Sequence, residues 1–480
     1  MATIAEKDTI KTLTTHYIDG EFVESHGREV MDIIKPTNGK LIARVTLGDE
    51  VDTQRAIAAA KCAFATYGRS MKEERLHHLQ QLHKAVSARV DDLTAIMVEE
   101  YGGVARFARL IVESGISAFA AAEKALRDMR IKESWGKTTV TMEPVGVAGL
   151  ITAWNANALF ICLKLASAIA AGCTVVLKPS EMSTLQTRTM VDAIAAAGLP
   201  KGVFNVVTGL GTVVGAEMVR NRDVAKISFT GSVAVGEAIM RDGAATMKRV
   251  TLELGGKSPT IVLDDADFGK AIPSALILAF LNSGQACAAG TRLFVPRSRL
   301  DEAKRAIKDE MRNYTVGDPA DPKIMVGPMV SQKQYERVES YIRKGIEEGA
   351  DVLVGGEGRP QGLEAGFFVK PTVFVNVKNS MAIAQEEIFG PVLSVIAYDS
   401  EEEAVRLAND SNYGLHSAVM GTDTERARRV ASQLRAGRVV INNMADDPQA
   451  PWGGFKFSGV GREYGKYGIG AFLEPKAVLE

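Results

Sequence analysis

The stretch VGVAGLITAWNANALFICLKLASAIAAGCTVVL, residues 145–177, decides how this chain folds. Its two ends, 145–152 and 174–177, are rich in β-branched and aliphatic side chains, which favour buried strands. Between them, residues 158–171 are apolar and rich in alanine over a length typical of a helix. A strand, a helix and a second strand in this order predict two parallel strands joined by a crossover helix.

Strand and helix patterns keep alternating from this stretch towards the C-terminus, with a break at Gly255 and Gly256. Before the break, strands are expected at 203–207, 226–230 and 249–253, with helices at 187–197, 212–220 and 235–242. After it, strands are expected at 261–263, 291–295, 351–355, 372–376, 392–397, 416–420 and 438–441, with helices at 267–282, 301–313, 332–349, 401–409 and 423–434. The sequence therefore predicts an α/β fold with two doubly wound, Rossmann-like units, each built on a parallel sheet.

The N-terminal region follows different patterns. In residues 16–48, apolar and polar side chains alternate over short runs, and Asp19-Gly20 is a hairpin signal. Together these features predict a small β appendage. Residues 50–131 carry helical periodicity. Residues 137–143, KTTVTME, alternate but hold few apolar side chains, which suits a sheet edge or a subunit contact.

Length and composition narrow the class of protein. A chain of 480 residues is expected to form two or three domains, and 46% apolar with 24% charged residues is typical of a globular protein. A formal net charge of −1 gives no electrostatic reason to expect nucleic acid or a membrane surface as a partner. The sequence shows no signal-peptide pattern and no apolar run of about 20 residues. Four scattered cysteines, without CxxC or HExxH patterns, favour a reducing cytoplasm and predict neither a disulfide framework nor a metal site.

One cysteine stands in a loop of small residues, NSGQACAAG at 282–290. The small neighbours would let another molecule approach the thiol of Cys287 closely, as a nucleophile requires. A lone cysteine is more often a small buried hydrophobe that only packs. The loop by itself therefore leaves both interpretations open.

Three segments at expected strand ends carry residues suited to binding a dinucleotide, because helix N-termini at such places offer free N–H groups to phosphates. They are Gly209-Leu210-Gly211 with Gly215, Phe229-Thr230-Gly231-Ser232, and Lys178-Pro179-Ser180-Glu181. Each could be merely a turn, but three at consecutive strand ends favour a dinucleotide site. The carboxylate of Glu181 suits ribose hydroxyls and would repel a 2′-phosphate, which favours NAD over NADP.

Three further polar groups lie near expected turns. Glu253 ends a strand before two glycines, Asn155 follows Trp154 after another strand, and Glu387 precedes a Phe-Gly-Pro turn. Each has an ordinary alternative: an ion pair between Glu253 and Lys257, an asparagine turn, and a surface helix end.

Taken together, these segments resemble the aldehyde dehydrogenase family. The matching motifs are AWN at 153–155, KPSE at 178–181, FTGS at 229–232, ELGGKSP at 253–259, GQAC at 284–287, EEIFGPV at 386–392 and PWGGFKFSGVGRE at 451–463. They occur in the family's order over nearly the whole chain. The resemblance implies an NAD(P)-dependent, hydrolytic enzyme that oxidises an aldehyde to its carboxylic acid.

Carried onto this chain, the resemblance implies a role for each catalytic residue. Cys287 attacks the aldehyde to give a thiohemiacetal, whose oxyanion is held by the Asn155 amide and the backbone N–H of Cys287. Glu253 activates the water that hydrolyses the resulting thioester. Lys178 is expected to support the site, and Glu463 to relay protons near Lys178 or Glu253.

The resemblance also implies a cofactor site and a tunnel for the aldehyde. The cofactor residues are expected to be Thr152, Ala153, Trp154, Lys178, Ser180, Glu181, Gly211, Phe229, Thr230, Gly231, Ser232, Leu254, Gly255, Glu387 and Phe389. The tunnel walls are expected to be Asn157, Phe160, Leu163, Leu281, Ala286, Ala288, Trp452 and Phe455. The small side chains beside the thiol suit a bulky or aromatic aldehyde.

The sequence departs from the family pattern at two places. Relatives often read Trp-Asn-Xaa-Pro, but Asn155 here is followed by Ala156-Asn157-Ala158 without proline. Tyr101-Gly102-Gly103 stands where relatives often have Thr-Gly-Lys, and the sequence assigns no role to it.

The family's organisation implies an NAD-binding domain of residues 1–124 and 145–255 and a catalytic domain of residues 256–450. Residues 125–144 and 465–480 are expected to form an arm that extends a neighbour's sheet, giving a homodimer or homotetramer. A semialdehyde-acid dehydrogenase is the alternative as to substrate, and a non-catalytic structural protein on the same fold is the alternative as to class. The presence of Cys287, Glu253 and Asn155 together argues against the structural protein.

Overall fold

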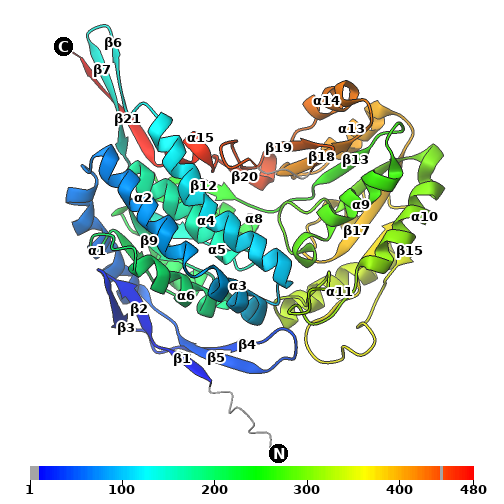
Figure 1. The fold of residues 1–480 in the computed structure, drawn as a ribbon, viewed down its shortest axis with the longest axis horizontal. Helices are drawn as coiled ribbons and strands as arrows, with labels where there is room; N and C mark the ends of the chain where they lie inside the picture. Colours follow the sequence, from blue (N-terminus) through cyan, green and yellow to red (C-terminus); the bar gives the residue numbers. More distant parts are fainter. Residues whose placement is uncertain (1–9, 444–446, 480) are drawn as a thin grey trace, which may run out of the picture.

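The computed structural model describes residues 10–443 and 447–479. The chain forms two lobes, seen side by side in Figure 1, and a narrow arm that projects from the first of them. Each lobe is built on one large sheet covered by helices, as the alternation of strand and helix patterns predicts. The predicted fold class is confirmed.

The first lobe holds an eight-stranded sheet of order β20-β12-β11-β8-β9-β10-β2-β3. Its strands are β2 (Thr15–Ile18), β3 (Glu21–Glu24), β8 (Val147–Ile151), β9 (Thr174–Lys178), β10 (Phe204–Val206), β11 (Val224–Thr230), β12 (Arg249–Glu253) and β20 (Gly459–Val460). The stretch that decides the fold forms β8, α5 (Asn157–Ala171) and β9, and the two strands pair in parallel. Because α5 is apolar around almost its whole circumference, it lies in the centre of this lobe's core.

The other helices of the first lobe cover this sheet or pack along α5. They are α1 (Glu50–Tyr67), α2 (Lys72–Ser87), α3 (Val90–Ile96) with a π-helical turn η1 (Met97–Tyr101), α4 (Ala105–Asp128), α6 (Thr184–Ala195), α7 (Ala216–Arg220), α8 (Val233–Gly243) and α15 (Gly465–Gly470).

The N-terminal β segments differ from the expected separate appendage. Asp19 and Gly20 turn the chain between β2 and β3 at positive φ, as the hairpin signal predicts. However, Tyr17 of β2 pairs with Val206 of β10, and its ring lies 6.0 Å from that of Phe204. The hairpin therefore extends the large sheet, because the edge of β10 offers unpaired backbone groups. A three-stranded sheet lies beside it, made of β1 (Lys11–Leu13), β5 (Leu41–Thr46) and β4 (Val30–Ile34).

The second lobe holds a seven-stranded sheet that is parallel except for the edge strand β15. Its order is β15 (Asp351–Val354), β16 (Thr372–Val375), β17 (Val392–Tyr398), β14 (Arg292–Pro296), β13 (Pro259–Val262), β18 (His416–Met420) and β19 (Arg438–Ile441). Its helices are α9 (Phe268–Ala279), α10 (Leu300–Glu310), α11 (Gln332–Glu347), α12 (Ala382–Gln385), α13 (Glu401–Asn409) and α14 (Thr424–Ser432). Two separate apolar clusters belong to this lobe.

The arm is a third, antiparallel sheet of three strands, β6 (Lys132–Trp135), β7 (Thr138–Pro144) and β21 (Leu473–Leu479). Figure 1 shows β6 and β7 extending beyond the helices of the first lobe, with the C-terminus beside them. Trp135 is 65% exposed and Leu479 is 76% exposed, so the arm has little core of its own. Among the described residues, no helix combines the length and the apolar character needed to cross a membrane.

In the first lobe, the carboxyl ends of the sheet's strands face the space between the lobes. In the second lobe, the amino ends of the strands face it. In the first lobe, Asn155 follows β8, while Lys178 and Glu253 end β9 and β12. In the second lobe, Cys287 and Glu387 lie in loops that precede β14 and β17. Ligands of doubly wound sheets bind at the carboxyl ends of the strands, so the first sheet is the one placed to bind a nucleotide.

Candidate active site

The loop that carries the cysteine begins with a strained turn. Asn282, Ser283 and Gly284 have φ angles of 51°, 57° and 74°, in the left-handed region. For the two residues with side chains this conformation costs on the order of 1 kcal/mol or more each, so contacts must hold it. A Cβ on Gly284 would lie 2.1 Å from the carbonyl oxygen of Gly390, which explains glycine at this position.

Polar side chains supply the contacts that hold this turn. The Asn282 amide donates to the carbonyl oxygens of Asn155, at 2.9 Å, and Gln285, at 3.2 Å. The Ser283 hydroxyl accepts from the backbone N–H of Gly327 at 2.9 Å. The turn is thereby tied to both lobes.

Cys287 is half-buried at the end of this loop and faces a cavity. Burial, followed by the charges of Glu387 and Glu253, raises the pKa of its thiol to about 12. The thiol is therefore protonated at neutral pH in this state, and a nearby base must take its proton before or during an attack. The backbone at Gly256 passes close to Cys287. A Cβ added to Gly256 would lie 2.4 Å from the Cys287 carbonyl oxygen.

Glu253 is a candidate general base of the site. Its carboxylate is 4% exposed, and neither oxygen has a hydrogen-bond partner among the described residues. Burial, and then repulsion from Glu463, raises its pKa well above the ordinary range. A carboxylate with a raised pKa accepts a proton more readily than an ordinary one, as a general base should.

Glu463 pairs with Lys164, a residue that the sequence analysis did not single out. The Lys164 ammonium lies 2.6 Å from the Glu463 carboxylate, and the Ser228 hydroxyl lies 3.0 Å from that ammonium. The sequence suggests a place for Glu463 near Lys178 or Glu253, and the structure favours the second: the Glu463 charge acts on Glu253, whereas Lys178 pairs with Glu181 at 2.8 Å. The signal was present in the sequence: a single lysine within the apolar helix α5 must be buried, and a buried cation needs a partner.

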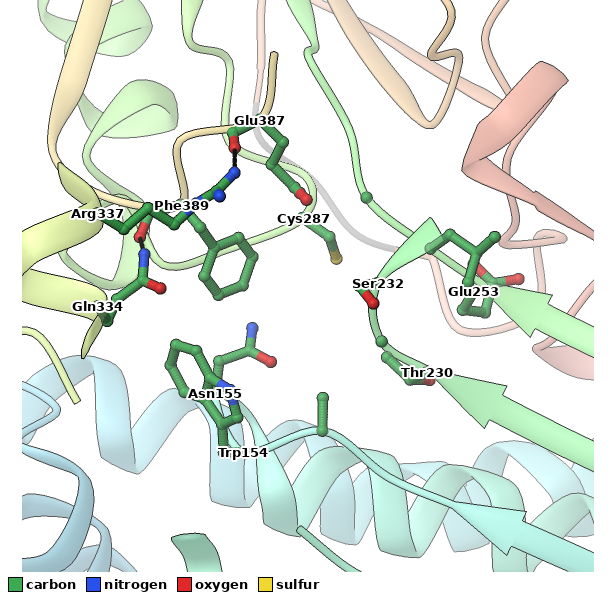
Figure 2. Close-up of a pocket in the computed structure, with 14 residues that line it drawn as sticks. Trp154, Asn155, Thr230, Ser232, Glu253, Cys287, Gln334, Arg337, Glu387 and Phe389 are labelled. Carbon is green, nitrogen blue, oxygen red and sulfur yellow. Dashed lines mark hydrogen bonds between the residues drawn. The ribbon is translucent and has the colours of Figure 1, made fainter. Parts of the chain in front are cut away.

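The Asn155 side chain joins the cysteine loop directly. Its amide nitrogen donates to the carbonyl oxygen of Gln285 at 3.0 Å, and the side chain is buried. An amide nitrogen carries two hydrogens, so this bond uses one of them. Figure 2 shows Asn155 and Trp154 facing Cys287 across the cavity.

That cavity has a volume of about 270 Å³ and contains residues from both lobes. The residues that line it are Ala153, Trp154, Asn155, Thr230, Gly231, Ser232, Glu253, Leu254, Gly255, Cys287, Gln334, Arg337, Glu387 and Phe389. A larger hollow shares Trp154, Ser232, Gln334 and Arg337 with it and reaches Glu181. The two together form a continuous route from Cys287 to the end of β9.

The walls of this route fit a dinucleotide. Trp154 and Phe389 stand edge to face, 5.3 Å between ring centroids, and Phe389 has a φ of 63°, a strain typical of functional sites. The Thr230 hydroxyl is buried without a partner among the described residues. Ser232 is the N-cap residue of α8 and no side chain caps the first turn, so N–H groups there can meet phosphates.

The far ends of the route carry groups suited to ribose hydroxyls. Lys178 and Glu181 form one end, and Glu387 forms the other, where its carboxylate accepts from the Gly256 N–H at 3.0 Å. Burial raises the pKa of Glu387 to about 7. Among the remaining expected cofactor residues, Thr152 and Ser180 are buried beside this route, and Gly211 begins a π-helical turn with open space over its Cα.

Two residues of α11, neither of which the sequence indicated, line the cavity. Gln334 donates to the carbonyl oxygen of Phe389 at 2.7 Å, and Arg337 donates to that of Glu387, as the dashed lines in Figure 2 show. These two bonds fix the loop that carries Glu387 and Phe389. On an amphipathic helix, polar side chains three residues apart look like ordinary surface, so no sequence signal distinguishes them.

The structure brings some expected tunnel walls together and separates others. Leu163 and Trp452 pack in one apolar cluster with Tyr464, and Ala286 and Ala288 flank the cysteine. Phe160 packs near Trp154, Leu281 begins the strained turn, and Phe455 is 39% exposed.

Asn157 is not a tunnel wall. It is completely buried, and its amide donates to the Thr187 hydroxyl of α6 at 3.2 Å. Because it has no exposed surface at the start of α5, its side chain cannot form part of a tunnel wall.

Comparison with known proteins identifies the class. The model of the aldehyde dehydrogenase family matches residues 22–478, and the chain belongs to this family. It is accordingly an oxidoreductase that acts on aldehydes.

One relative and two solved structures illustrate the similarity. A 3-succinoylsemialdehyde-pyridine dehydrogenase of a Pseudomonas species is 44% identical, over 96% of this chain and 98% of the relative. Aldehyde dehydrogenase C of Pseudomonas syringae, whose mutant was solved with NAD+ and octanal, is 42% identical with a TM-score of 0.96, covering 98% of each chain. Betaine aldehyde dehydrogenase of Staphylococcus aureus, solved with NAD+, is 37% identical with a TM-score of 0.94, covering 97% of this chain and 94% of that one.

Proposed function

We propose that this enzyme oxidises an aldehyde to its carboxylic acid with NAD+ as hydride acceptor, through a covalent adduct on Cys287. One observation carries the proposal: Cys287, Asn155, Glu253 and the walls of a dinucleotide route line a single cavity. A non-catalytic protein on this fold would have no use for an unpartnered buried carboxylate beside a half-buried thiol.

The first step is attack by Cys287. The sulfur adds to the carbonyl carbon, and the resulting oxyanion of the thiohemiacetal accepts hydrogen bonds from the second Asn155 N–H and the backbone N–H of Cys287. Each such donor typically contributes about 3 to 4 kcal/mol to the transition state. The thiol proton passes to water before or during the attack, so this step does not require Glu253.

NAD+ would be held along the route from Glu181 to Glu387. When bound, it would supply the acceptor for the hydride that leaves the thiohemiacetal carbon, so that a thioester remains on Cys287. Lys178 and Glu181 would bind the ribose at the adenosine end, Glu387 would bind the other ribose, and Phe389 would pack beside it. The Glu181 carboxylate would repel a 2′-phosphate, which favours NAD over NADP.

The last step is hydrolysis. Glu253 takes a proton from water, which attacks the thioester and releases the acid. Relatives that pass the acyl group to a thiol tend to lack this base, so its presence favours the hydrolytic, non-acylating reaction. The Lys164–Glu463 pair next to Glu253 can pass the proton onwards.

A Glu253→Gln variant tests this sequence of steps. It should still give one rapid burst of NADH with an aldehyde such as octanal, because attack and oxidation precede hydrolysis. Steady-state turnover should fall by at least about a hundredfold, since the base is lost. Stopped-flow absorbance of NADH measures both phases, with Cys287→Ser as the control that should show no burst. Full turnover in Glu253→Gln would reject the assignment.

The substrate is expected to be a bulky or aromatic aldehyde, since the side chains flanking Cys287 are small. A semialdehyde that also carries a carboxylate is the second candidate. Ranking octanal, benzaldehyde and succinic semialdehyde by kcat/KM distinguishes the two.

We further propose the division of the chain that the family implies. Residues 1–124 and 145–255 form the NAD-binding domain, residues 256–450 form the catalytic domain, and residues 125–144 and 465–480 form the arm. The arm binds a second copy of the chain, giving a homodimer or homotetramer. The four free cysteines suit a reducing cytoplasm as its compartment.

A further inference from the structure

Tyr101 stands where the family pattern reads threonine, and the structure places it against the catalytic loop. It is the last residue of the π-helical turn η1, a conformation that is frequent at functional sites. The side chain is 1% exposed, and its ring lies 5.7 Å from that of Trp154. Its hydroxyl accepts a hydrogen bond from the Gln285 side chain at 3.2 Å.

The Gln285 side chain is bonded at both ends of its amide. Its nitrogen donates to the Tyr101 hydroxyl and to the Pro328 carbonyl oxygen, each at 3.2 Å. Its oxygen accepts from the Val330 N–H at 3.0 Å. With 1% of its surface exposed, the side chain has no water to replace a lost partner, so these bonds fix its orientation.

The backbone of the same residue holds the oxyanion donor. The Gln285 carbonyl oxygen accepts one hydrogen of the Asn155 amide at 3.0 Å, and Cys287 lies two residues further along. The direction of this carbonyl therefore sets the direction of the second Asn155 hydrogen, the one available to an oxyanion on the cysteine adduct.

We propose that Tyr101 is a positioning residue for the oxidation: through Gln285 it aims the Asn155 amide at the oxyanion formed on Cys287. The proposal rests on the roles proposed above for Asn155 and Cys287. The contact with Trp154, the residue before Asn155, adds a second point at which Tyr101 fixes the same segment. Tyr101 is not among the residues that line the cavity, so its effect passes through the oxyanion donor.

The test removes the hydroxyl and keeps the ring. In full-length Tyr101→Phe, the rate of the NADH burst with octanal at saturating NAD+ should fall about tenfold, a part of what loss of a whole oxyanion donor costs. The KM for NAD+ should stay unchanged. Tyr398→Phe is the matched control, because it loses a buried hydroxyl that donates to the Val262 carbonyl at 2.8 Å in the core of the second lobe. It should lower the melting temperature by a similar amount and leave the burst rate unchanged.

A double-mutant cycle separates positioning from general weakening of the fold. In an Asn155→Ala background, adding Tyr101→Phe should change the burst rate by less than about twofold, because the group on which Tyr101 acts is gone. The proposal is overturned if the tenfold loss persists in that background, or if Tyr101→Phe and Tyr398→Phe behave alike. A normal burst in Asn155→Ala alone would instead reject the proposed role of Asn155, and a normal burst in Cys287→Ser would reject the proposed function.

Discussion

Lys164 shows how a single buried charge tunes the site. Its ammonium has almost no exposed surface and lies 2.6 Å from the Glu463 carboxylate, and both groups act on Glu253 through their charges. Glu463 raises the pKa of Glu253, and Lys164 lowers it. Removing one or the other member of this pair should therefore shift the pKa of Glu253 in opposite directions.

We expect Lys164→Met and Glu463→Gln to move the pH profile of turnover in opposite directions. Glu253 acts as a base when deprotonated, so turnover rises with pH through its pKa. Loss of the Lys164 cation raises that pKa and moves the rising limb to higher pH, whereas loss of the Glu463 charge moves it to lower pH. Steady-state kcat measured from about pH 6 to pH 10 records the limb.

Thermal unfolding of the same variants provides the control. Removing one member of a buried ion pair typically costs about 3 to 5 kcal/mol, so both variants should melt lower than the parent protein. If both pH profiles shift in the same direction, or if neither profile shifts, the electrostatic explanation is contradicted. The ion pair would then have a purely structural role.

At the scale of the element, the turn before the cysteine is the part of the site under strain. Two residues with side chains and one glycine take the left-handed conformation in succession, between α9 and β14. Bonds from Asn282 and Ser283 to both lobes hold the turn. Such strain persists only where the surroundings over-determine it, and here it delivers the thiol to the cavity.

Gly284→Ala should displace this turn. Its φ of +74° disfavours alanine, and the added Cβ would lie 2.1 Å from the backbone oxygen of Gly390. We expect a loss of about 2 kcal/mol or more in the free energy of unfolding and at least a tenfold fall in kcat, as the thiol moves.

Gly362→Ala is the matched control for this change. Its φ of +80° imposes a similar conformational cost, but nothing lies within 4 Å of the added Cβ. Chemical denaturation and steady-state kinetics of the two variants separate the effects. If Gly284→Ala loses no more activity than Gly362→Ala, the close approach to Gly390 is not what positions the cysteine.

At the scale of the whole molecule, the arm carries apolar side chains that a single copy of the chain leaves exposed. The antiparallel register runs from Leu473 opposite Pro144 to Leu479 opposite Thr138. Leu473 is buried in the first lobe, whereas Val478 and Leu479 are 46% and 76% exposed. An exposed strand with apolar side chains is suited to pair with another chain.

Ending the chain at Pro475 should therefore yield a smaller assembly with an intact fold. The truncation keeps Leu473 in the core and removes Glu480 together with the exposed strand residues 476–479. Light scattering after gel filtration should report the lower mass, and circular dichroism should report unchanged secondary structure. Lys476→Ala, which removes only the ion pair with Glu143, should keep the parent mass. An unchanged mass in the truncated protein would show that the arm does not join subunits.

The sequence by itself determined the local features of this protein. Periodicity is a property of neighbouring residues, so the alternation beginning at residues 145–177 predicted the two parallel sheets. The motifs around Cys287, Glu253 and Asn155 predicted residues that the structure places around one cavity or its walls. Asn155 and Glu253 meet because the carboxyl ends of parallel strands lie at one edge of a sheet, whereas Cys287 comes from a loop that precedes β14 of the other sheet.

The tertiary structure decided which distant groups meet. The hairpin at Asp19-Gly20 joins the large sheet because β10 leaves an edge open, and Glu463 pairs with Lys164 rather than Lys178 because α5 passes beneath it. Asn157 turned out to be a core residue of the α5–α6 contact, and Tyr101 a partner of Gln285. Burial and hydrogen-bond partners depend on how elements pack, and a pattern of neighbouring residues does not contain that information.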